Sequence, residues 1–237
     1  MRAAILQPSY IPWRGAFHIV QKCDVFVFYD DVQYDKHGWR NRNRVKTAQG
    51  TRWLTIPVLH KGNVAQHTPV NQIRVNPDDD WERRHWQTLR QSYARAPFFE
   101  RTAALVEPFY SRKVDLLADF TIDLTVALAG QLGLGDRRFL RASSLGVAGE
   151  KTDRLLAILA KVGATHYVSG PSARAYLDEA AFAAAGIGLE YMSYDYPAYQ
   201  QLHGAFDPQV SILDLLFMQG PQAPAFIWGA GDSVAAR

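Results

Sequence analysis

The sequence predicts an α/β protein with a mostly parallel sheet flanked by helices, an N-terminal strand–loop–helix–strand unit and a helical middle segment. At the N-terminus, an apolar run at 2–7 is followed by a Pro/Gly-containing loop at 8–15, an apolar helix at 16–22 and a second apolar run at 24–29. A strand, a crossover helix and a second strand of these lengths form a parallel pair. Between 80 and 134 the apolar residues recur with a helical period instead.

The remaining elements follow from apolar periodicity and from capping residues. Further strands are expected at 53–58, 71–75, 138–141, 165–169 and 189–194. Helices are expected from 80 to just before Pro97, at 98–110, at 116–132, at 153–162, after the turn at 170–173 up to 185, and at 213–218. The expected N-caps are Asp80 and Thr152, Ser172 is an alternative cap of the helix after the turn at 170–173, and Gly163 is expected to end the helix at 153–162. Ser211 and Asp214 have the spacing of a capping box, and the last residues are expected to fray.

The chain is expected to form a single unit that spans residues 1–237. Its length suits one large domain or two small ones, and no repeat, low-complexity segment or linker divides it. The unit could have two lobes, a mainly α/β lobe made of 1–78 and 136–228 and a helical lobe at 79–135.

Charge, cysteine content and hydropathy argue against several classes of protein. The net charge is only +3 and the acidic residues are spread along the chain, so nucleic acid is not an expected partner. Cys23 is the only cysteine, which excludes an internal disulfide and favours a reducing compartment, the cytoplasm. No segment approaches the roughly 20 apolar residues of a membrane span, and membrane insertion is not expected. The oligomeric state stays open.

The first candidate site is the loop between the first strand and the first helix. Gln7, Tyr10, Trp13 and Arg14 lie there, at the carboxyl end of a strand where open α/β sheets bind ligands. The helix N-terminus offers unpaired N–H groups to an anion, and Arg14 could add a charge-assisted bond. The competing interpretation is that Pro and Gly shape the turn while the aromatic residues pack.

The second candidate site follows the strand at 24–29. Asp30 and Asp31 are the candidate catalytic residues, and Lys36 lies a few residues further on. Two carboxylates at the end of a strand can bind a divalent cation such as Mg²⁺, or one of them can serve as a general base. The sequence does not rank Asp30 against Asp31.

The third candidate site is an alternation of basic and amide residues directly after Trp39, namely Arg40, Asn41, Arg42, Asn43 and Arg44. In an extended segment the arginines would share one face and the asparagines the other. Guanidinium groups on one face could hold a diphosphate, with each charge-assisted bond contributing about 1.5–3 kcal/mol. The alternative is a solvated edge strand protected by its charges.

Two further groups complete the candidate ligand-binding residues. Ser169 and Ser172 flank a Gly-Pro turn between a strand and a helix, and Tyr199 lies in a tyrosine-rich loop that could stack on a sugar or a base. Helix capping by Ser172 and simple packing of the tyrosines are the competing interpretations. The histidines have no zinc-binding spacing, and Cys23 is expected to be a buried thiol without a catalytic role.

Together these motifs resemble those of the WbqC-like family. The resemblance rests on QPSYIPWRGAF at 7–17, DDVQY at 30–34, Trp39 with Asn41, Arg42 and Asn43, Tyr167 with SGPS at 169–172, and a closing segment with Tyr199, Gln200, Phe206, Pro208 and SILDLLF at 211–217. It covers nearly the whole chain. One departure is Ala173-Arg174, where the family pattern has Gly-Lys, and arginine can also bind phosphate.

The resemblance implies a role in polysaccharide (O-antigen) biosynthesis. The leading hypothesis is a transferase that places an acyl or aminoacyl group on an amino sugar carried by a nucleotide. In this hypothesis Arg42 and Arg44 hold the diphosphate with Arg14, while Asp30 or Asp31 deprotonates the amine or holds Mg²⁺. The alternatives are a nucleotidyltransferase-like enzyme and a non-catalytic binding module of a polysaccharide assembly complex.

Overall fold

A computed structural model describes residues 1–36, 38–59 and 67–229 of the chain. In these residues a five-stranded sheet has the order β5-β2-β1-β6-β7, and every pair of neighbours is parallel. Its strands are β1 (Arg2–Leu6), β2 (Val25–Phe28), β5 (Arg138–Arg141), β6 (His166–Ser169) and β7 (Gly188–Tyr191). The predicted α/β class with a mostly parallel sheet is therefore confirmed.

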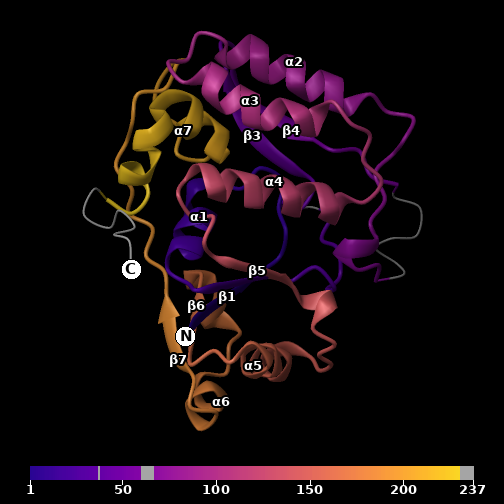
Figure 1. The fold of residues 1–237 in the computed structure, drawn as a ribbon, viewed down its shortest axis with the longest axis vertical. Helices are drawn as coiled ribbons and strands as arrows, with labels where there is room; N and C mark the ends of the chain where they lie inside the picture. Colours follow the sequence, from indigo (N-terminus) through magenta and orange to yellow (C-terminus); the bar gives the residue numbers. More distant parts are fainter. Residues whose placement is uncertain (37, 60–66, 230–237) are drawn as a thin grey trace.

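Helices cover both faces of the sheet (Figure 1). Ala4 and Phe26 belong to the core that contains α1 (Arg14–Gln21) and α4 (Leu117–Gln131). The alternate residues of the same strands, such as Ala3 and Val25, pack against the other layer, which contains α5 (Lys151–Val162) and α6 (Glu179–Ala184). Because both faces are buried, β1 and β2 are continuous apolar runs rather than alternating ones.

The remaining helices gather with a hairpin at the end of the molecule that lies far from α5 and α6 (Figure 1). They are α2 (Trp81–Tyr93), α3 (Phe99–Tyr110) and α7 (Ile212–Gln219), and the hairpin is formed by β3 (Arg42–Thr47) and β4 (Gly50–Thr55). Their apolar side chains belong to the same hydrophobic cluster as α1 and α4, so one core runs from the sheet into the helical segment. None of the helices in the described parts of the chain is long and apolar enough to cross a membrane.

Two strand predictions were wrong in position or type. The strand expected at 53–58 begins earlier, as β4, because it pairs with β3 across the two-residue turn at 48–49. Gly50, the first residue of β4, has a φ of 106°. The segment expected as a strand at 71–75 instead begins with the 3₁₀ helix η1 (Val70–Gln72) and continues with isolated bridges at Arg74 and Val75. The other 3₁₀ helices are η2 (Ala142–Ser144), η3 (Pro171–Ala175) and η4 (Gly220–Phe226).

The predicted caps also need correction. α5 begins one residue before Thr152, so this threonine lies in the first turn rather than at the cap. Ser172 lies inside η3, and the next helix, α6, is capped by Asp178, which accepts a hydrogen bond from the backbone N–H of Ala181 at 3.1 Å. Asp80 is at the N-cap position of α2, but its carboxylate pairs with Arg83 instead of the backbone. Gly163 ends α5 in the left-handed conformation, as predicted.

Candidate functional site

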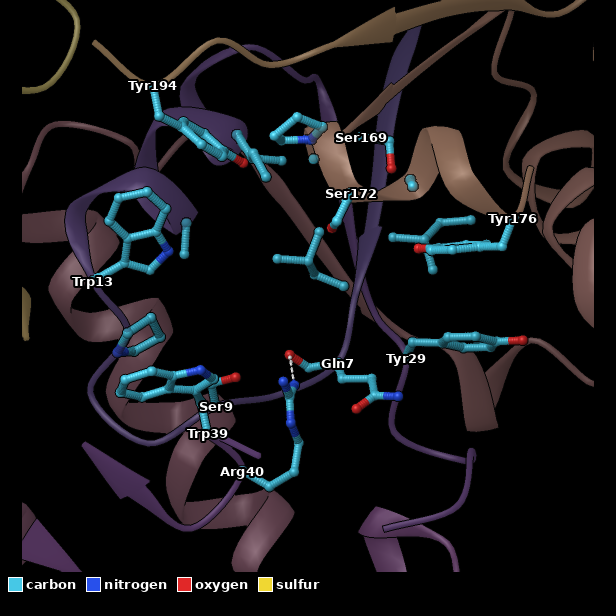
Figure 2. A pocket seen from close by; sticks show the side chains of 18 of the residues that line it. Gln7, Ser9, Trp13, Tyr29, Trp39, Arg40, Ser169, Ser172, Tyr176 and Tyr194 are labelled. Atoms are coloured by element: carbon cyan, nitrogen blue, oxygen red, sulfur yellow. Dashed lines mark hydrogen bonds between the residues drawn. The ribbon is translucent and has the colours of Figure 1, made fainter. Parts of the chain in front are cut away.

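A cavity of about 1150 Å³ lies at the carboxyl ends of β1 and β6 (Figure 2). Gln7 follows β1 directly, and Ser169 and Gly170 mark the end of β6. From β1 the sheet continues to β2 on one side, whereas β6 leads to β7 on the other. The crevice between β1 and β6 is therefore the topological switch point of the sheet, where α/β proteins bind their ligands.

Aromatic side chains form two opposite sides of the cavity. Trp13, Trp39 and Tyr194 lie on one side in Figure 2, and Tyr29 and Tyr176 lie on the other. Between them, a polar strip is formed by side chains from three separate segments, Gln7, Arg40 and Ser172. A cavity with this division can hold a molecule with ring systems at both ends and polar groups between them.

The indole of Trp13 depends on the glycine two residues later. A Cβ atom on Gly15 would lie only 2.3 Å from the Trp13 ring, so only glycine lets the indole lie over the first turn of α1. The ring packs edge-on against Tyr194, with centroids 4.9 Å apart and planes at 77°. The Pro/Gly loop thus positions a cavity wall in addition to shaping a turn.

Arg40 provides positive charge at the floor of the cavity. Its Nη1 donates hydrogen bonds to the carbonyl oxygens of Gln7 at 3.0 Å and Pro8 at 3.1 Å. Its Nε has no hydrogen-bond partner among the described residues. Burial lowers the pKa of Arg40 to about 10, and nearby Asp35 and Tyr34 oppose this shift. The guanidinium therefore stays charged at neutral pH.

The first turn of α5 adds a second cation. Lys151 and Thr152 both line the cavity, and Lys151 has a left-handed φ of 48°. The N-cap residue Glu150 makes no side-chain bond to the first N–H groups of this helix, whose dipole favours an anion. Arg40 and Lys151 are the charged side chains among the described residues that line the cavity, and no carboxylate is among them.

The structure brings together six of the predicted ligand-binding residues at this cavity: Gln7, Trp13, Trp39, Asn43, Ser169 and Ser172. Asn43 also holds the loop that forms the cavity wall. Its Nδ2 donates to the carbonyl oxygens of Tyr10 at 3.1 Å and Ile11 at 2.8 Å, and Ile11 has an unusual φ of 36°.

Four other predicted residues point into the core or toward backbone groups away from the cavity. The hydroxyl of Tyr10 forms hydrogen bonds with the hydroxyl of Tyr110 and with Nδ1 of His85. The hydroxyl of Tyr199 donates to the carboxylate of Asp214. Arg14 donates to the carbonyl oxygens of Pro197 and Phe226, and Asn41 donates to that of Ile56. The bonds of Tyr10 and Arg14 connect segments at least 75 residues apart, whereas those of Asn41 and Tyr199 each span 15 residues.

The two arginines of β3 lie on the outer face of the hairpin. The guanidinium carbon of Arg42 lies 4.7 Å from the centre of the Trp53 ring, and that of Arg44 lies 5.8 Å from it. Arg44 also donates to the backbone and side-chain oxygens of Gln209. Neither arginine lines the cavity, and Lys36 is an exposed residue outside it.

The two aspartates at the end of β2 contact the segment before α5 and the first turn of α5. Asp30 is completely buried and accepts hydrogen bonds from the backbone N–H of Ser143 at 3.0 Å and its hydroxyl at 2.7 Å. Asp31 pairs with Arg154 at 2.5 Å. Neither aspartate lines the cavity. In the described residues no group of three Asp, Glu, His or Cys side chains is placed to hold a metal ion.

Sequence reasoning did not select Lys151, Tyr29 and Tyr176 as ligand-binding residues, and it grouped Arg40 with Arg42 and Arg44 and Tyr194 with the other tyrosines of its loop. Arg40 belongs to the arginine and asparagine alternation, but β3 begins only at Arg42, so Arg40 is free to turn into the cavity. Lys151 follows two glycines with positive φ, at 146 and 149, and such a loop before a helix is a signal that could have been used.

Comparisons with known proteins identify the family. Residues 7–226 match the sequence model of the WbqC-like protein family. The chain belongs to the WbqC-like protein family. This WbqC-like chain is also similar to the uncharacterized protein Rv1507c of Mycobacterium tuberculosis (strain ATCC 25618 / H37Rv), with 40% identity over 228 residues, which cover 95% of this chain and 97% of that protein. No solved structure matches it. The matched range contains all the described cavity-lining residues except Ile5 and Leu6.

Proposed function

We propose that this protein binds a phosphate-bearing small molecule in the cavity and acts on it as a transferase. One observation supports this most directly: the charged groups among the described lining residues are both cations, Arg40 and Lys151. An anion would gain attraction from both groups and from the start of α5, and no carboxylate among these residues would repel it. The aromatic walls would bind the ring systems of the same molecule.

The size of the cavity supports a large ligand. Ligand pockets usually measure about 300–1,000 Å³, and this cavity of about 1150 Å³ exceeds that range. A nucleotide-linked sugar has a base at one end, a sugar at the other and a diphosphate between them. Its base would stack between Trp13 and Trp39, its phosphates would meet Arg40, Lys151 and Ser172, and its sugar would lie toward Tyr29.

The reaction class that we propose is acyl or aminoacyl transfer to an amino sugar, as part of polysaccharide biosynthesis. The amine nitrogen forms a bond to the carbonyl carbon of an activated ester or thioester. The bond from that carbon to the donor oxygen or sulfur breaks and its electron pair leaves with the donor, while the amine loses a proton to a base or to solvent. Binding residues that hold both reactants in the large cavity would supply the gain from proximity.

The first test compares equivalent substitutions at the two ends of α5. Lys151→Gln is expected to weaken the binding of UDP-N-acetylglucosamine about fivefold, because it removes one charge-assisted contact of an exposed side chain, where water screens the attraction. Lys161→Gln changes the last turn of the same helix, far from the cavity, and is expected to leave the affinity unchanged. Isothermal titration calorimetry measures both dissociation constants. Equal affinities in the two variants would contradict this placement of the phosphates.

A second test separates two roles for Asp31. The Asp31–Arg154 pair connects the end of β2 to the first turn of α5. The guanidinium carbon of Arg154 also lies 5.3 Å from the centre of the Tyr29 ring. We therefore propose that Asp31 is a positioning residue. Asp31→Asn is then expected to raise the dissociation constant of the nucleotide sugar about three- to tenfold, with a much smaller loss of turnover.

The catalytic role predicted from the sequence gives the opposite pattern for Asp31→Asn. Removal of a general base lowers the turnover number by about 10²–10⁴ and leaves binding almost unchanged. The roles are distinguished by measuring, on the same variant, kcat with a UDP-linked amino sugar whose amine is free and an activated thioester, and the dissociation constant of the nucleotide sugar. Saturable binding without any turnover in the native protein would favour a binding module instead of a transferase.

A further inference from the structure

Exposed apolar side chains are concentrated at the cavity and directly beside it. Among the large hydrophobic residues that the described chain exposes, Trp13, Trp39 and Tyr176 line the cavity. Trp53 is 45% exposed and lies next to Trp39, with ring centroids 5.3 Å apart and planes at 35°. The indole of Trp39, itself 44% exposed, is therefore shared between the cavity and a surface outside it.

This surface, the Trp39–Trp53 platform, consists of the two indoles together with Arg42 and Arg44. The guanidinium carbons of the two arginines lie 4.7 Å and 5.8 Å from the centre of the Trp53 ring. Arg44 donates to Gln209, which lines the cavity, so the platform is joined to the cavity rim by a hydrogen bond as well as by Trp39. Arg44 also pairs with Asp207, whose Oδ1 lies 3.9 Å from its Nη2. The platform therefore combines exposed aromatic surface with two guanidinium groups, one of which has a carboxylate partner.

The fold does not require an indole at position 53. In the hairpin Trp53 pairs with Arg44, and its side chain lies on the outer face of β4, whereas the next residue, Leu54, is buried. A polar residue at this outward position would preserve the pattern of the strand. A large exposed aromatic surface beside a binding cavity is typical of an interaction site.

We propose that the Trp39–Trp53 platform is a second ligand site that binds a saccharide ring carrying a phosphate or carboxylate group. The C–H face of a pyranose ring packs on an indole by burial of apolar surface and dispersion, and the arginines pair with the acidic group. Two indoles match one or two sugar rings in size, whereas a stable protein partner would need about 800 Å² of surface on each side. This inference goes beyond the proposed function, because it adds a second ligand site outside the cavity.

The experiment follows the indole Nε1–H signals of the protein by nuclear magnetic resonance during two titrations. The probes are a hyaluronan tetrasaccharide, which is acidic, and a chitin tetrasaccharide, which is neutral. The signals of Trp39 and Trp53 are expected to shift with the acidic probe at about fivefold lower concentration than with the neutral one. Those of the buried Trp81 and Trp228 serve as internal controls and are expected to stay in place.

Variants test the same platform. Trp53→Ala and Arg42→Gln are each expected to weaken binding of the acidic saccharide about five- to tenfold, while UDP-N-acetylglucosamine binds as in the native protein. Arg101→Gln, on the exposed face of α3, is the matched control for Arg42→Gln. It is expected to leave the affinity for both ligands unchanged. Trp53 is exposed, so its replacement is expected to leave the fold intact.

The outcomes separate this inference from the proposed function. If the nucleotide sugar binds but the Trp53 signal does not respond to the acidic saccharide, the inference is overturned and the cavity assignment stands. Equal responses to the acidic and neutral probes would overturn the charged part of the inference. If the saccharide shifts Trp53 but no nucleotide sugar binds, the platform stands as a saccharide site and the proposed function fails.

Discussion

Replacement of Asp214 by alanine is expected to lower the free energy of unfolding by about 2–6 kcal/mol, since two buried hydroxyl groups lose their acceptor at a cost of about 1–3 kcal/mol each. Asp214 is completely buried in α7 and accepts hydrogen bonds from the hydroxyls of Tyr93 and Tyr199, both at 2.8 Å. The hydroxyl of Tyr93 in turn accepts from the backbone N–H of Lys46 in β3. The carboxylate therefore joins α2, α7, β3 and the loop at 199.

Urea unfolding measures this effect. Asp195→Ala is the matched control, because Asp195 is exposed and no hydrogen bond or ion pair involves its side chain in the described structure. We expect its unfolding midpoint to stay close to that of the native protein. A midpoint for Asp214→Ala as high as that of the control would show that the carboxylate does not stabilise the fold.

Acidification from pH 6.5 to pH 5 is expected to cost about 2 kcal/mol of stability through His85 alone. The side chain is buried between Tyr10, whose hydroxyl lies 2.9 Å from Nδ1, and the backbone of Thr55. Burial lowers the pKa of His85 to about 3, and the charge of Arg84 lowers it further. The other charged and titratable groups that face it are Asp79, Arg52 and Tyr110.

The direction in which stability changes with pH follows from the lowered pKa of His85. Below pH 6.5 the unfolded chain binds a proton at this histidine and the folded chain does not, so stability falls as the pH falls toward 3. The variant His85→Phe is expected to be less stable at pH 7 but to lose about 2 kcal/mol less between pH 6.5 and 5. Chemical unfolding at both pH values measures the slope of the unfolding free energy against pH. The control is His166→Gln, because His166 is exposed. An unchanged slope in His85→Phe would contradict the prediction.

The elements predicted correctly are those whose signal is local. The apolar runs of β1 and β2, the loop and α1 between them, and the helical periods of α2, α3 and α4 all lie in continuous stretches of sequence. The predictions failed where pairing with a distant segment decided the conformation. β3 is a run of polar residues that becomes a strand only because β4 folds back on it, and the segment at 71–75 has isolated bridges instead of a partner strand.

The candidate site was predicted in position but only partly in composition. The crevice after β1 and the turn after β6 were both expected to bind ligands, and the structure brings them together in one cavity. Which side chains enter it was not predictable, because neighbours in the sequence point in different directions. Trp13 lines the cavity, whereas Arg14 points away from it to backbone carbonyls. Arg40 lines the floor of the cavity, whereas Asn41 donates a hydrogen bond to the carbonyl oxygen of Ile56, the residue after β4.

The sequence by itself determined the α/β class, the parallel N-terminal unit and the membership of the WbqC-like family, because these depend on periodicity and on motifs that are continuous along the chain. Only the tertiary structure decided that Lys151 joins Arg40 at one cavity, that Asp30 and Asp31 contact Ser143 and Arg154, and that Trp53 lies beside Trp39. The physical reason is that these contacts depend on how strands and helices from distant parts of the chain pack. Residue type and spacing do not specify that packing.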